Sequence, residues 1–358
     1  MALFETKNDP ILQEDLENIV ASDLPWSAFA GKRVLVFGAT GLVGGAVTRA
    51  LCTANRVRGL GIRLVLPVRS ADKARAVFGD LIEREQIELI EGDICRPLRV
   101  DGAVDFILHA AAVTDSKLMV TKPAETIMTA IDGTRSVLEL AREKHVEGMV
   151  YLSSMEAYGK PTVGADKVRE TDLGTIDHLT VRSCYPESKR MAECLCACYH
   201  AEYGVPVKIA RLAQTFGAGI SPTENRVFAQ FARSLINGTD IVLHTAGDSW
   251  GNYCYTAECV SALLFLMING QSGEAYNVVN EAANLRIREM AELVAGMSDG
   301  AIRVVFDIPE DALQYGYAPS VELHLSGEKL AALGWTAQIG LREMYRRLIA
   351  SMQATGNV

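Results

Sequence analysis

The chain has 358 residues, of which 49% are hydrophobic and 22% charged, so it can bury a large core as an ordinary globular protein. Its 35 basic and 44 acidic residues give a formal net charge of −9. Such a surface repels phosphate backbones, and the sequence has no strong basic patch, so we expect no nucleic-acid partner.

The sequence also predicts a cytoplasmic protein without a membrane segment. Residues 1–15 are acidic and lack the basic and apolar regions of a signal peptide. The longest apolar run, residues 260–268, is far shorter than the roughly 20 residues that span a bilayer. The eight cysteines then read as free thiols. We expect no metal site, and we interpret Cys194, Cys196 and Cys198 as small buried residues of a helix.

Strands and helices alternate along the first part of the chain. A leader, residues 1–31, has helical spacing of apolar residues over 11–20 and is interrupted at Pro25. Short apolar strands are then predicted at residues 33–37, 62–68, 87–90, 104–108 and 149–153, with helices at 44–52 and 72–78. Such alternation indicates a parallel sheet covered by helices on both faces.

The alternation loosens after residue 204. Residues 207–212 and 275–279 still have the pattern of core strands, so we expect the chain to return to the first sheet. Residues 195–206 are expected to contain a further helix. The sequence predicts a main domain over residues 32–216 with a returning segment at about 252–279. Residues 217–251 and 280–358 would form a smaller α/β lobe.

A glycine-rich turn connects the first strand to the first helix of the main domain. Gly38 permits a tight turn, Gly41 lets the backbone approach a pyrophosphate, and Gly44 allows close packing of helix against strand. The helix N-terminus adds unpaired N–H groups and the positive end of a dipole. The turn therefore predicts a dinucleotide site, contacted by Gly38, Thr40, Gly41, Leu42, Val43 and Gly44.

The end of the second strand bears on the choice of cofactor. A carboxylate there would bind a ribose 2′-hydroxyl, whereas a cation accommodates a 2′-phosphate. Arg69 follows the strand and Lys73 lies one turn further on. We therefore expect NADP in preference to NAD, and an NAD site beside a solvated Arg69 is the alternative.

A tyrosine and a lysine four residues apart form the candidate catalytic pair. Tyr185 and Lys189 would share one face of a helix, so the phenol and the ammonium can converge on one substrate oxygen. An adjacent ammonium is expected to lower the pKa of the phenol toward the working range of a base. Ser154, which follows a predicted strand, would hydrogen-bond the same oxygen, and Ser153 is its competitor.

These motifs together resemble the extended short-chain dehydrogenase/reductases, and in particular the nucleotide-sugar epimerases and dehydratases. The resemblance implies a Rossmann-type doubly wound parallel sheet, a smaller substrate lobe, a tightly bound NAD(P) and a homodimer formed through the helix of Tyr185. It also implies that Lys189 holds the nicotinamide ribose. Further cofactor contacts carried over from the family are Asp93, Ile94, His109, Ala110 and Ala111.

The substrate side departs from the family pattern at several positions. Residues 211–217 resemble the family segment Arg-x-x-Asn-x-Tyr-Gly, but Gln214 replaces the substrate-binding Asn. Gly251 stands where an Arg usually clamps the substrate pyrophosphate, and Arg226 is the candidate substitute. Thr114 is a further candidate substrate contact. Ala130 replaces a common Asn near the cofactor.

Glu156 bears on the type of reaction. In the dehydratases that the chain resembles, a Glu at this place is a candidate base at sugar C5. Met155 stands where the dehydratases carry a proton-donating Asp, and a thioether cannot donate a proton. We therefore rank a nucleotide-sugar epimerase acting through a 4-keto intermediate first, a 4,6-dehydratase second and a 4-ketose reductase third. A catalytically silent dinucleotide-binding protein is the remaining alternative, although the candidate Ser, Tyr and Lys are all present.

Overall fold

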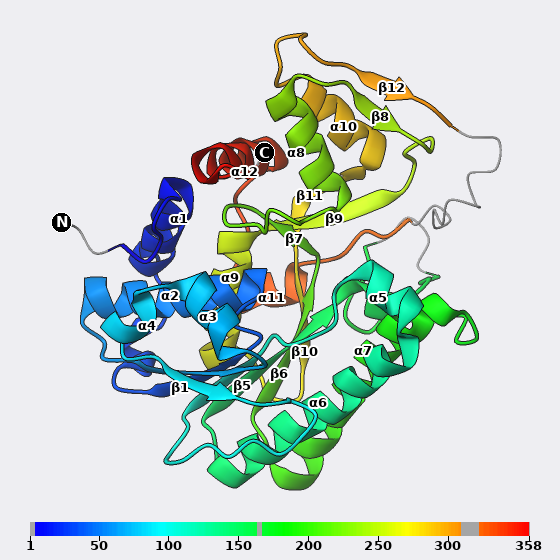
Figure 1. Ribbon diagram of the computed structural model, residues 1–358. Helices are drawn as coiled ribbons and strands as arrows, with labels where there is room; N and C mark the ends of the chain where they lie inside the picture. The colour runs from blue at the N-terminus through cyan, green and yellow to red at the C-terminus, as the bar shows by residue number, and fades with distance from the viewer. Residues whose placement is uncertain (1–3, 163–166, 309–321, 358) are drawn as a thin grey trace.

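The computed structural model describes residues 4–162, 167–308 and 322–357, and a seven-stranded parallel sheet lies at its centre (Figure 1). The strand order is β10-β6-β5-β4-β1-β2-β3, which places β10 beside strands that precede it by more than 60 residues. The strands are β1 (Arg33–Phe37), β2 (Arg63–Val68), β3 (Glu88–Glu91), β4 (Phe106–His109), β5 (Gly148–Ser154), β6 (Val207–Leu212) and β10 (Ala275–Val278).

Helices cover both faces of this sheet. One face packs against α2 (Leu42–Arg58), α3 (Ala71–Phe78) and α9 (Thr256–Asn269), and the other against α6 (Pro123–Lys144) and α7 (Cys184–Tyr203). The short helices between strands are α4 (Leu81–Arg84), α5 (Ser116–Thr121), η1 (Trp26–Phe29), η2 (Met155–Tyr158) and η3 (Val181–Ser183). The strands are buried on both sides, which explains why their sequences are nearly continuous apolar runs.

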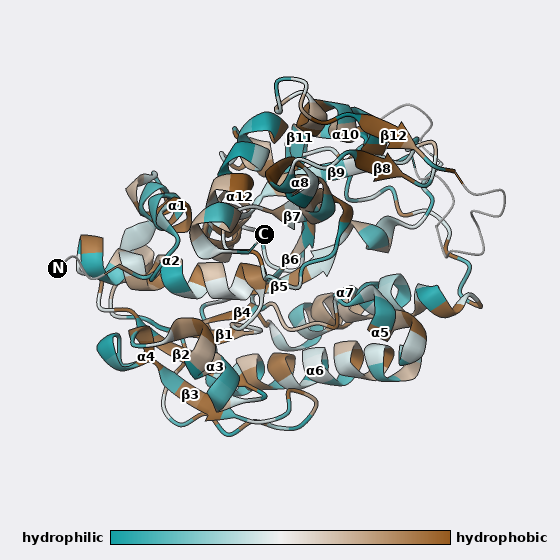
Figure 2. Ribbon diagram, turned by 45° about the horizontal axis from the view of Figure 1, so that its top comes forward, coloured by the Kyte–Doolittle hydropathy of each residue, from teal (hydrophilic) through white to brown (hydrophobic). Residues whose placement is uncertain are grey.

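A second region carries two smaller sheets above the carboxyl edge of the first (Figure 1). Strands pair in the orders β11-β9-β7 and β12-β8, and the helices of this region enclose an apolar core of their own. The strands are β7 (Gln214–Phe216), β8 (Ile241–Leu243), β9 (Trp250–Tyr255), β11 (Asn280–Arg286) and β12 (Val304–Phe306), and the helices are α8 (Val227–Asn237), α10 (Ile287–Ala295) and α12 (Leu341–Thr355). The short helix α11 (Glu328–Ala332) packs against β10 of the main sheet instead. In Figure 2, β8 and β12 are among the most apolar segments of this region.

The predicted fold class is confirmed, and the predicted strands of the main sheet are all present. Two details differ. The expected separate helix at residues 195–206 is the second half of α7, which runs unbroken until Gly204 ends it in a left-handed conformation with φ +72°. The interpretation of three buried cysteines is wrong for Cys194 and Cys198, which are exposed, because only Cys196 faces the sheet.

The leader forms helix α1 (Pro10–Ala21), which joins the two regions of the molecule. It packs against α2 and α9 of the main sheet and against α12 of the second region. The carboxylate of the buried Asp15 accepts a hydrogen bond from the Tyr255 phenol at 2.5 Å and from Arg347 Nε at 2.9 Å. A charged pair that is buried and hydrogen-bonded in this way fixes the helix in one position.

Two absences hold for the described residues. None of the helices there is long and apolar enough to cross a membrane. In the same part of the chain, no three His, Cys, Asp or Glu side chains gather in a group that could hold a metal ion.

Candidate active site

The glycine-rich turn between β1 and α2 closes on the backbone of the neighbouring strand. Gly38 has φ +80°, and a Cβ on it would lie 2.6 Å from the carbonyl carbon of Ala110. A Cβ on Gly44 would lie 2.4 Å from the Gly38 carbonyl oxygen. Real Cβ atoms do not approach backbone so closely, so both positions require glycine. Gly41 is the N-cap of α2 and has no side chain to occupy the free N–H groups of the first turn.

This turn fits the pyrophosphate of a dinucleotide. Leu42, Val43 and Gly44 form the first turn of α2, where backbone N–H groups point out of the helix toward an anion. Thr40 lies in the turn, and the partly buried Ala110 and Ala111 face it from the end of β4. The predicted phosphate contacts are therefore together in space.

The predicted adenosine-side residues lie along the ends of β2 and β3. Arg69, Lys73 and Asp93 are exposed. Glu91, which the sequence analysis did not single out, accepts a hydrogen bond from the Ala71 backbone N–H at 2.8 Å. Its carboxylate thereby occupies the N-terminus of α3, where a 2′-phosphate would otherwise find a free donor.

The next two predicted cofactor residues, Ile94 and His109, are packed inward. Ile94 packs against Gly133 of α6. The His109 ring is 2% exposed, its Nε2 lies 3.1 Å from the Thr134 hydroxyl, and burial lowers its pKa to about 3. The imidazole is thus a neutral core group, and only the backbone of His109 is available to a ligand.

Ser154, Tyr185 and Lys189 converge at the carboxyl end of β5. Tyr185 and Lys189 lie one turn apart on α7, and the Lys189 ammonium is 5.7 Å from the centre of the Tyr185 ring. Ser154 hydrogen-bonds the Tyr185 phenol and also accepts from the Glu156 backbone N–H at 3.2 Å. The three predicted residues are therefore brought together.

Ser153 is not available for the same task. Its hydroxyl donates to the buried Glu193 carboxylate, which also binds Arg211 through Nη2 at 2.7 Å. Glu193 lies one turn beyond Lys189 on α7. This buried group joins β5, β6 and α7 behind the site, and it leaves Ser154 as the hydroxyl that faces Tyr185.

The pKa of Tyr185 shifts in the direction opposite to the predicted one. Burial raises the pKa of the phenol to about 12, and the Glu156 carboxylate adds to the rise. The hydrogen bond from Ser154 and the positive charges of Arg182 and Arg226 lower the pKa in part. Burial outweighs the lowering that the sequence predicted from Lys189, and burial also lowers the pKa of Lys189, to about 8.

Glu156 lies beside the phenol in an ion pair that the sequence analysis missed. Arg182 Nη2 donates to Glu156 Oε1 at 3.0 Å, and the Arg182 guanidinium lies 5.8 Å from the centre of the Tyr185 ring. Both side chains are about two-fifths exposed, at 38% and 40%. The position of Arg182 three residues before Tyr185 could have marked it as a neighbour of the phenol, but no sequence signal pairs it with Glu156, which lies 26 residues away.

A second missed arginine holds the loop of Ser154 and Glu156 against α7. Arg190 donates through Nε to the Ala157 carbonyl at 2.7 Å and through Nη2 to the Gly174 carbonyl at 2.6 Å. Lys189 donates to the Leu152 carbonyl at 2.7 Å. Adjacent residues of α7 thus hold the chain on both sides of Ser154.

Comparisons with known proteins agree with this geometry. The NAD dependent epimerase/dehydratase family matches residues 34–279, more than half of the chain. The chain belongs to this family. UDP-glucuronic acid decarboxylase 6 of Arabidopsis thaliana is 30% identical over 314 residues, which are 87% of this chain and 86% of that protein.

Two solved structures of the family show the same fold at lower identity. UDP-glucose 4-epimerase of Thermotoga maritima, with UDP-glucose, superposes with a TM-score of 0.74 at 20% identity, covering 90% of this chain and 99% of that one. dTDP-glucose 4,6-dehydratase of Bacillus anthracis, in complex with NAD, has a TM-score of 0.71 at 16% identity, covering 90% and 96%.

The structure explains how the chain accommodates Gly251 where the family usually has an arginine. A Cβ on Gly251 would lie 2.4 Å from the Tyr253 phenol oxygen, so the ring of Tyr253 fills the space that an arginine at 251 would need. Tyr253 is fully buried, and its hydroxyl has no hydrogen-bond partner among the described residues.

The other predicted substrate residues are Arg226, Gln214 and Thr114. Arg226 caps the start of α8 and binds Glu224 through Nε at 2.9 Å and through Nη2 at 2.7 Å. It is close enough to Tyr185 to act on the pKa of the phenol. Gln214 begins β7 beside Tyr253, and Thr114 is exposed just before α5.

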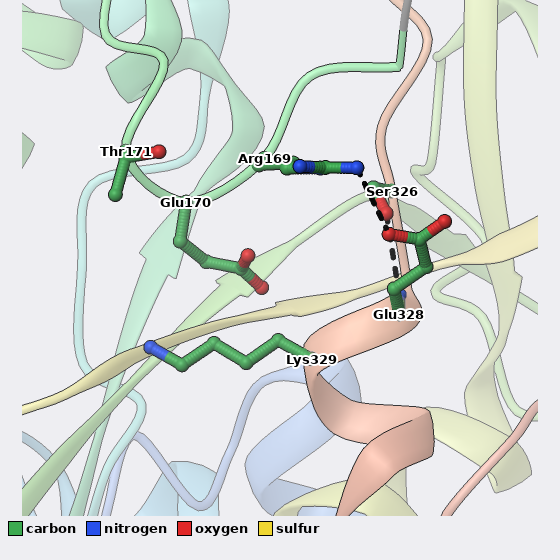
Figure 3. A pocket seen from close by; sticks show the side chains of 6 residues that line it. All are labelled: Arg169, Glu170, Thr171, Ser326, Glu328 and Lys329. Atoms are coloured by element: carbon green, nitrogen blue, oxygen red, sulfur yellow. Dashed lines mark hydrogen bonds and ion pairs between the residues drawn. The ribbon is translucent and has the colours of Figure 1, made fainter.

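A surface hollow of about 430 Å³ lies away from these residues (Figure 3). It lies next to the outer strand β10, and the Arg169 and Glu328 side chains pair across it at 3.5 Å. Lys329 binds the Ala275 carbonyl of β10 at 2.8 Å. These contacts cover the free edge of the sheet and contain none of the predicted catalytic groups. The lining residues are Arg169, Glu170, Thr171, Ser326, Glu328 and Lys329.

Proposed function

We propose that this protein oxidises the C4 hydroxyl of a nucleotide-activated sugar to a transient ketone, using a bound nicotinamide dinucleotide, and then changes the sugar at carbon 5. The observation that carries the proposal is the convergence of Tyr185, Ser154, Lys189 and Glu156 at one edge of the parallel sheet, beside a glycine-rich turn that fits a pyrophosphate.

In the first step, Tyr185 removes the proton of the C4 hydroxyl while Ser154 donates a hydrogen bond to the same oxygen. Lys189, whose ammonium lies 5.7 Å from the centre of the Tyr185 ring, would hold the nicotinamide ribose. A nicotinamide dinucleotide bound at the glycine-rich turn would supply the hydride acceptor, and its positive charge would lower the raised pKa of the Tyr185 phenol. The low exposure of Tyr185, 9%, keeps water away from the reacting oxygen.

Glu156 extends the chemistry to carbon 5, where a C4 ketone makes the neighbouring proton acidic. The sequence alone ranks inversion at C4 first. Inversion at C4 needs no carboxylate at C5, however, and the Glu156–Arg182 pair stands beside the Tyr185 phenol. We therefore place C5 chemistry first and C4 epimerisation second. The Arabidopsis relative is a UDP-glucuronic acid decarboxylase and the Bacillus structure a dTDP-glucose 4,6-dehydratase, and both reactions alter carbon 6, the substituent of C5.

The test is NMR of products formed from UDP-, GDP-, CDP- and TDP-sugars in deuterated water. We expect deuterium at C5 with the wild-type enzyme and its loss in Glu156→Gln. Inversion at C4 without exchange would support epimerisation instead. No product from any sugar, together with no reduced nicotinamide at 340 nm, would contradict the proposal.

We propose that one region of the molecule binds the cofactor and the other binds the sugar nucleotide. Residues 32–216 and 252–279 would hold the cofactor, and residues 217–251 and 280–358 the sugar nucleotide. In the structure β7 and β9 pair with each other in the small sheet, so the substrate region also draws on both ends of the cofactor segment. Arg226 is proposed to bind the substrate pyrophosphate in place of the arginine that Gly251 lacks.

The preference for NADP over NAD stays a proposal, and two features act in opposite directions. Arg69 and Lys73 supply cations beside β2, whereas the Glu91 carboxylate at the N-terminus of α3 repels a 2′-phosphate. The Bacillus dehydratase holds NAD. Titration of both cofactors into wild type, Arg69→Ala and Glu91→Gln separates the two effects, since only loss of Arg69 should weaken NADP selectively.

We also propose that the protein is a homodimer that joins α5, α6 and α7 of two copies. Large apolar side chains are exposed on these helices and on the loop before Tyr185: Leu118, Val120, Met128, Val181 and Met191. Such a cluster is unusual on a monomer. Light scattering should give twice the mass of the chain, and a monomeric wild-type protein would contradict the proposal.

A further inference from the structure

The leader helix α1 lies outside the part of the chain that matches the family. The match begins at residue 34, whereas α1 covers Pro10–Ala21, and none of the predicted cofactor, catalytic or substrate residues lies on it. The helix packs against α2 and α9 of the main sheet and against α12 of the second region (Figure 1). It therefore contacts both regions of the molecule.

Two buried carboxylates connect α1 to the second region. The Asp15 carboxylate accepts hydrogen bonds from the Tyr255 phenol of β9 at 2.5 Å and from Arg347 Nε of α12 at 2.9 Å. The carboxylate of Asp9, the N-cap of α1, accepts a hydrogen bond from the Ser351 hydroxyl of α12 at 2.5 Å. All five side chains are buried, with at most 7% of their surface exposed.

The partners of these carboxylates in turn contact residues 214–226, a segment that begins and ends with predicted substrate residues. Tyr255 is the strand partner of Phe216, which lies in β7 at the start of this segment. The Ser351 hydroxyl accepts a hydrogen bond from the Gly219 backbone N–H at 3.0 Å, in the loop that follows β7. Helix α1 thus reaches the segment at two points through buried polar groups.

The Asp15 cluster contributes more to geometry than to stability. A buried ion pair adds little net stability, because taking both charges out of water costs about as much free energy as their attraction returns. Hydrogen bonds to a charged group are directional, however, and they fix the partners in one arrangement. Apolar side chains of similar volume would fill the same space without fixing the position of β9.

We propose that Asp15 and Asp9 are positioning residues for the substrate, and that helix α1 holds residues 214–226 in place through Tyr255 and Ser351. This inference rests on the proposed function, because it assigns that segment to the sugar nucleotide, and it adds the leader helix to the site. Loss of these bonds should weaken substrate binding and leave cofactor binding intact, because the glycine-rich turn is positioned by backbone contacts with the end of β4.

The test is a triple variant that keeps the buried volume and removes the polar bonds: Asp15→Leu, Tyr255→Phe and Arg347→Met. Its melting temperature should stay close to that of the wild type. Hydrogen exchange of the protein without ligands, followed by mass spectrometry, should become about 10-fold faster at residues 214–226 and stay unchanged at residues 33–58.

A second carboxylate of α1 provides the matched control. Glu17 pairs at 3.0 Å with Arg56 of α2, within the main domain, so Glu17→Gln should leave the exchange of residues 214–226 unchanged. If the triple variant does not fold, Tyr255→Phe alone removes one bond and keeps the Asp15–Arg347 pair. A smaller acceleration, confined to the same segment, is then expected.

The ligand measurement uses UDP-glucose and the enzyme loaded with NAD, by calorimetry. In the triple variant UDP-glucose should bind about 10-fold more weakly, because a small displacement of residues far from the chemistry is sufficient for such a loss, and NAD affinity should stay within about a factor of two. An equal loss of affinity for both ligands would overturn the inference, since α1 would then act on the whole fold.

The exchange rates separate this inference from the proposed function. Wild-type rates throughout, or an acceleration spread equally over residues 33–58 and 214–226, would show that α1 does not position the segment, and only this inference fails. If the loaded wild type does not bind UDP-glucose, the failure lies with the proposed substrate class, and the exchange rates alone decide whether α1 holds residues 214–226.

Discussion

Glycine occupies decisive positions in the cofactor region and in the substrate region, but with opposite consequences. At Gly38 and Gly44 the missing side chains let two stretches of backbone meet, which brings the first turn of α2 against the end of β1. At Gly251 the missing side chain is replaced by the ring of Tyr253, which closes the space. Glycine therefore lets the backbone turn of the cofactor region form, whereas at position 251 it leaves a space that the Tyr253 ring fills.

The two sites differ because one binds its ligand through backbone groups and the other through side chains. The cofactor region presents backbone N–H groups at the end of α2, and these depend on the fold and on a few glycines. The catalytic groups at the carboxyl edge of the same sheet, in contrast, are side chains whose partners come from distant segments, such as Arg182 with Glu156. Substitutions at the glycine-rich turn should therefore impair cofactor binding, whereas substitutions of the catalytic side chains should impair turnover.

The largest effect is expected from Tyr185→Phe, which removes the proposed base. Turnover should fall by about 10³-fold or more, a typical scale for loss of acid–base catalysis at a single group. Cofactor affinity should stay within a factor of two, because the phenol contacts the substrate oxygen. Tyr203→Phe, an exposed tyrosine on the same helix, is the control. Turnover within a few-fold of wild type in Tyr185→Phe would reject the assigned role.

Alanine at the glycines tests the comparison directly. Gly38→Ala and Gly44→Ala force a Cβ into backbone, so we expect loss of cofactor binding and a decrease of about 1–3 kcal/mol in the free energy of unfolding. Gly251→Ala meets the end of the Tyr253 ring and should leave cofactor affinity intact. Gly340→Ala, with open space around it, is the neutral control. Equal loss of cofactor binding at all four positions would show that the two regions do not differ.

Arg190→Gln should lower kcat about 10-fold with little change in KM, because the loop of Ser154 and Glu156 loses its attachment to α7. Arg190→Lys should recover part of the rate. In a double mutant with Ser154→Ala the two losses should not add, since Arg190 acts through that loop. Additive losses would assign Arg190 a general structural role, and Arg135→Gln on the exposed face of α6 controls for loss of charge.

The smallest effect concerns stability against pH. The pKa of Lys189 is about 8 in the folded protein and 10.5 as an ordinary value. Between these limits the unfolded chain binds more protons, so stability should rise as pH increases from 8 to 10.5. In Lys189→Met this part of the rise should vanish from the melting curves, whereas Lys117→Met, at an exposed position, should keep it. If stability depends on pH in Lys189→Met as it does in the wild type, burial does not lower the pKa of the Lys189 amine.

Much of the cofactor region could be predicted because its signals are local. The glycine turn, the short apolar strands and the Tyr185–Lys189 pair each depend on residues within one or two turns of chain. The exposed Cys194 and Cys198, the continuous α7 and the raised pKa of Tyr185 could not, because they depend on which face of a helix meets the sheet. The family resemblance indicated that an arginine is missing at Gly251, but not that Tyr253 fills its place.

The sequence by itself determined the succession of strands and helices in the main domain, the glycine-rich turn and the candidate Tyr185–Lys189 pair, because backbone geometry and helical spacing follow from neighbouring residues. Only the tertiary structure decided that Ser153 hydrogen-bonds Glu193, that Ser154 hydrogen-bonds Tyr185, and that Arg182 pairs with Glu156. Those assignments depend on the distances between segments that approach one another only when the sheet and α7 have packed.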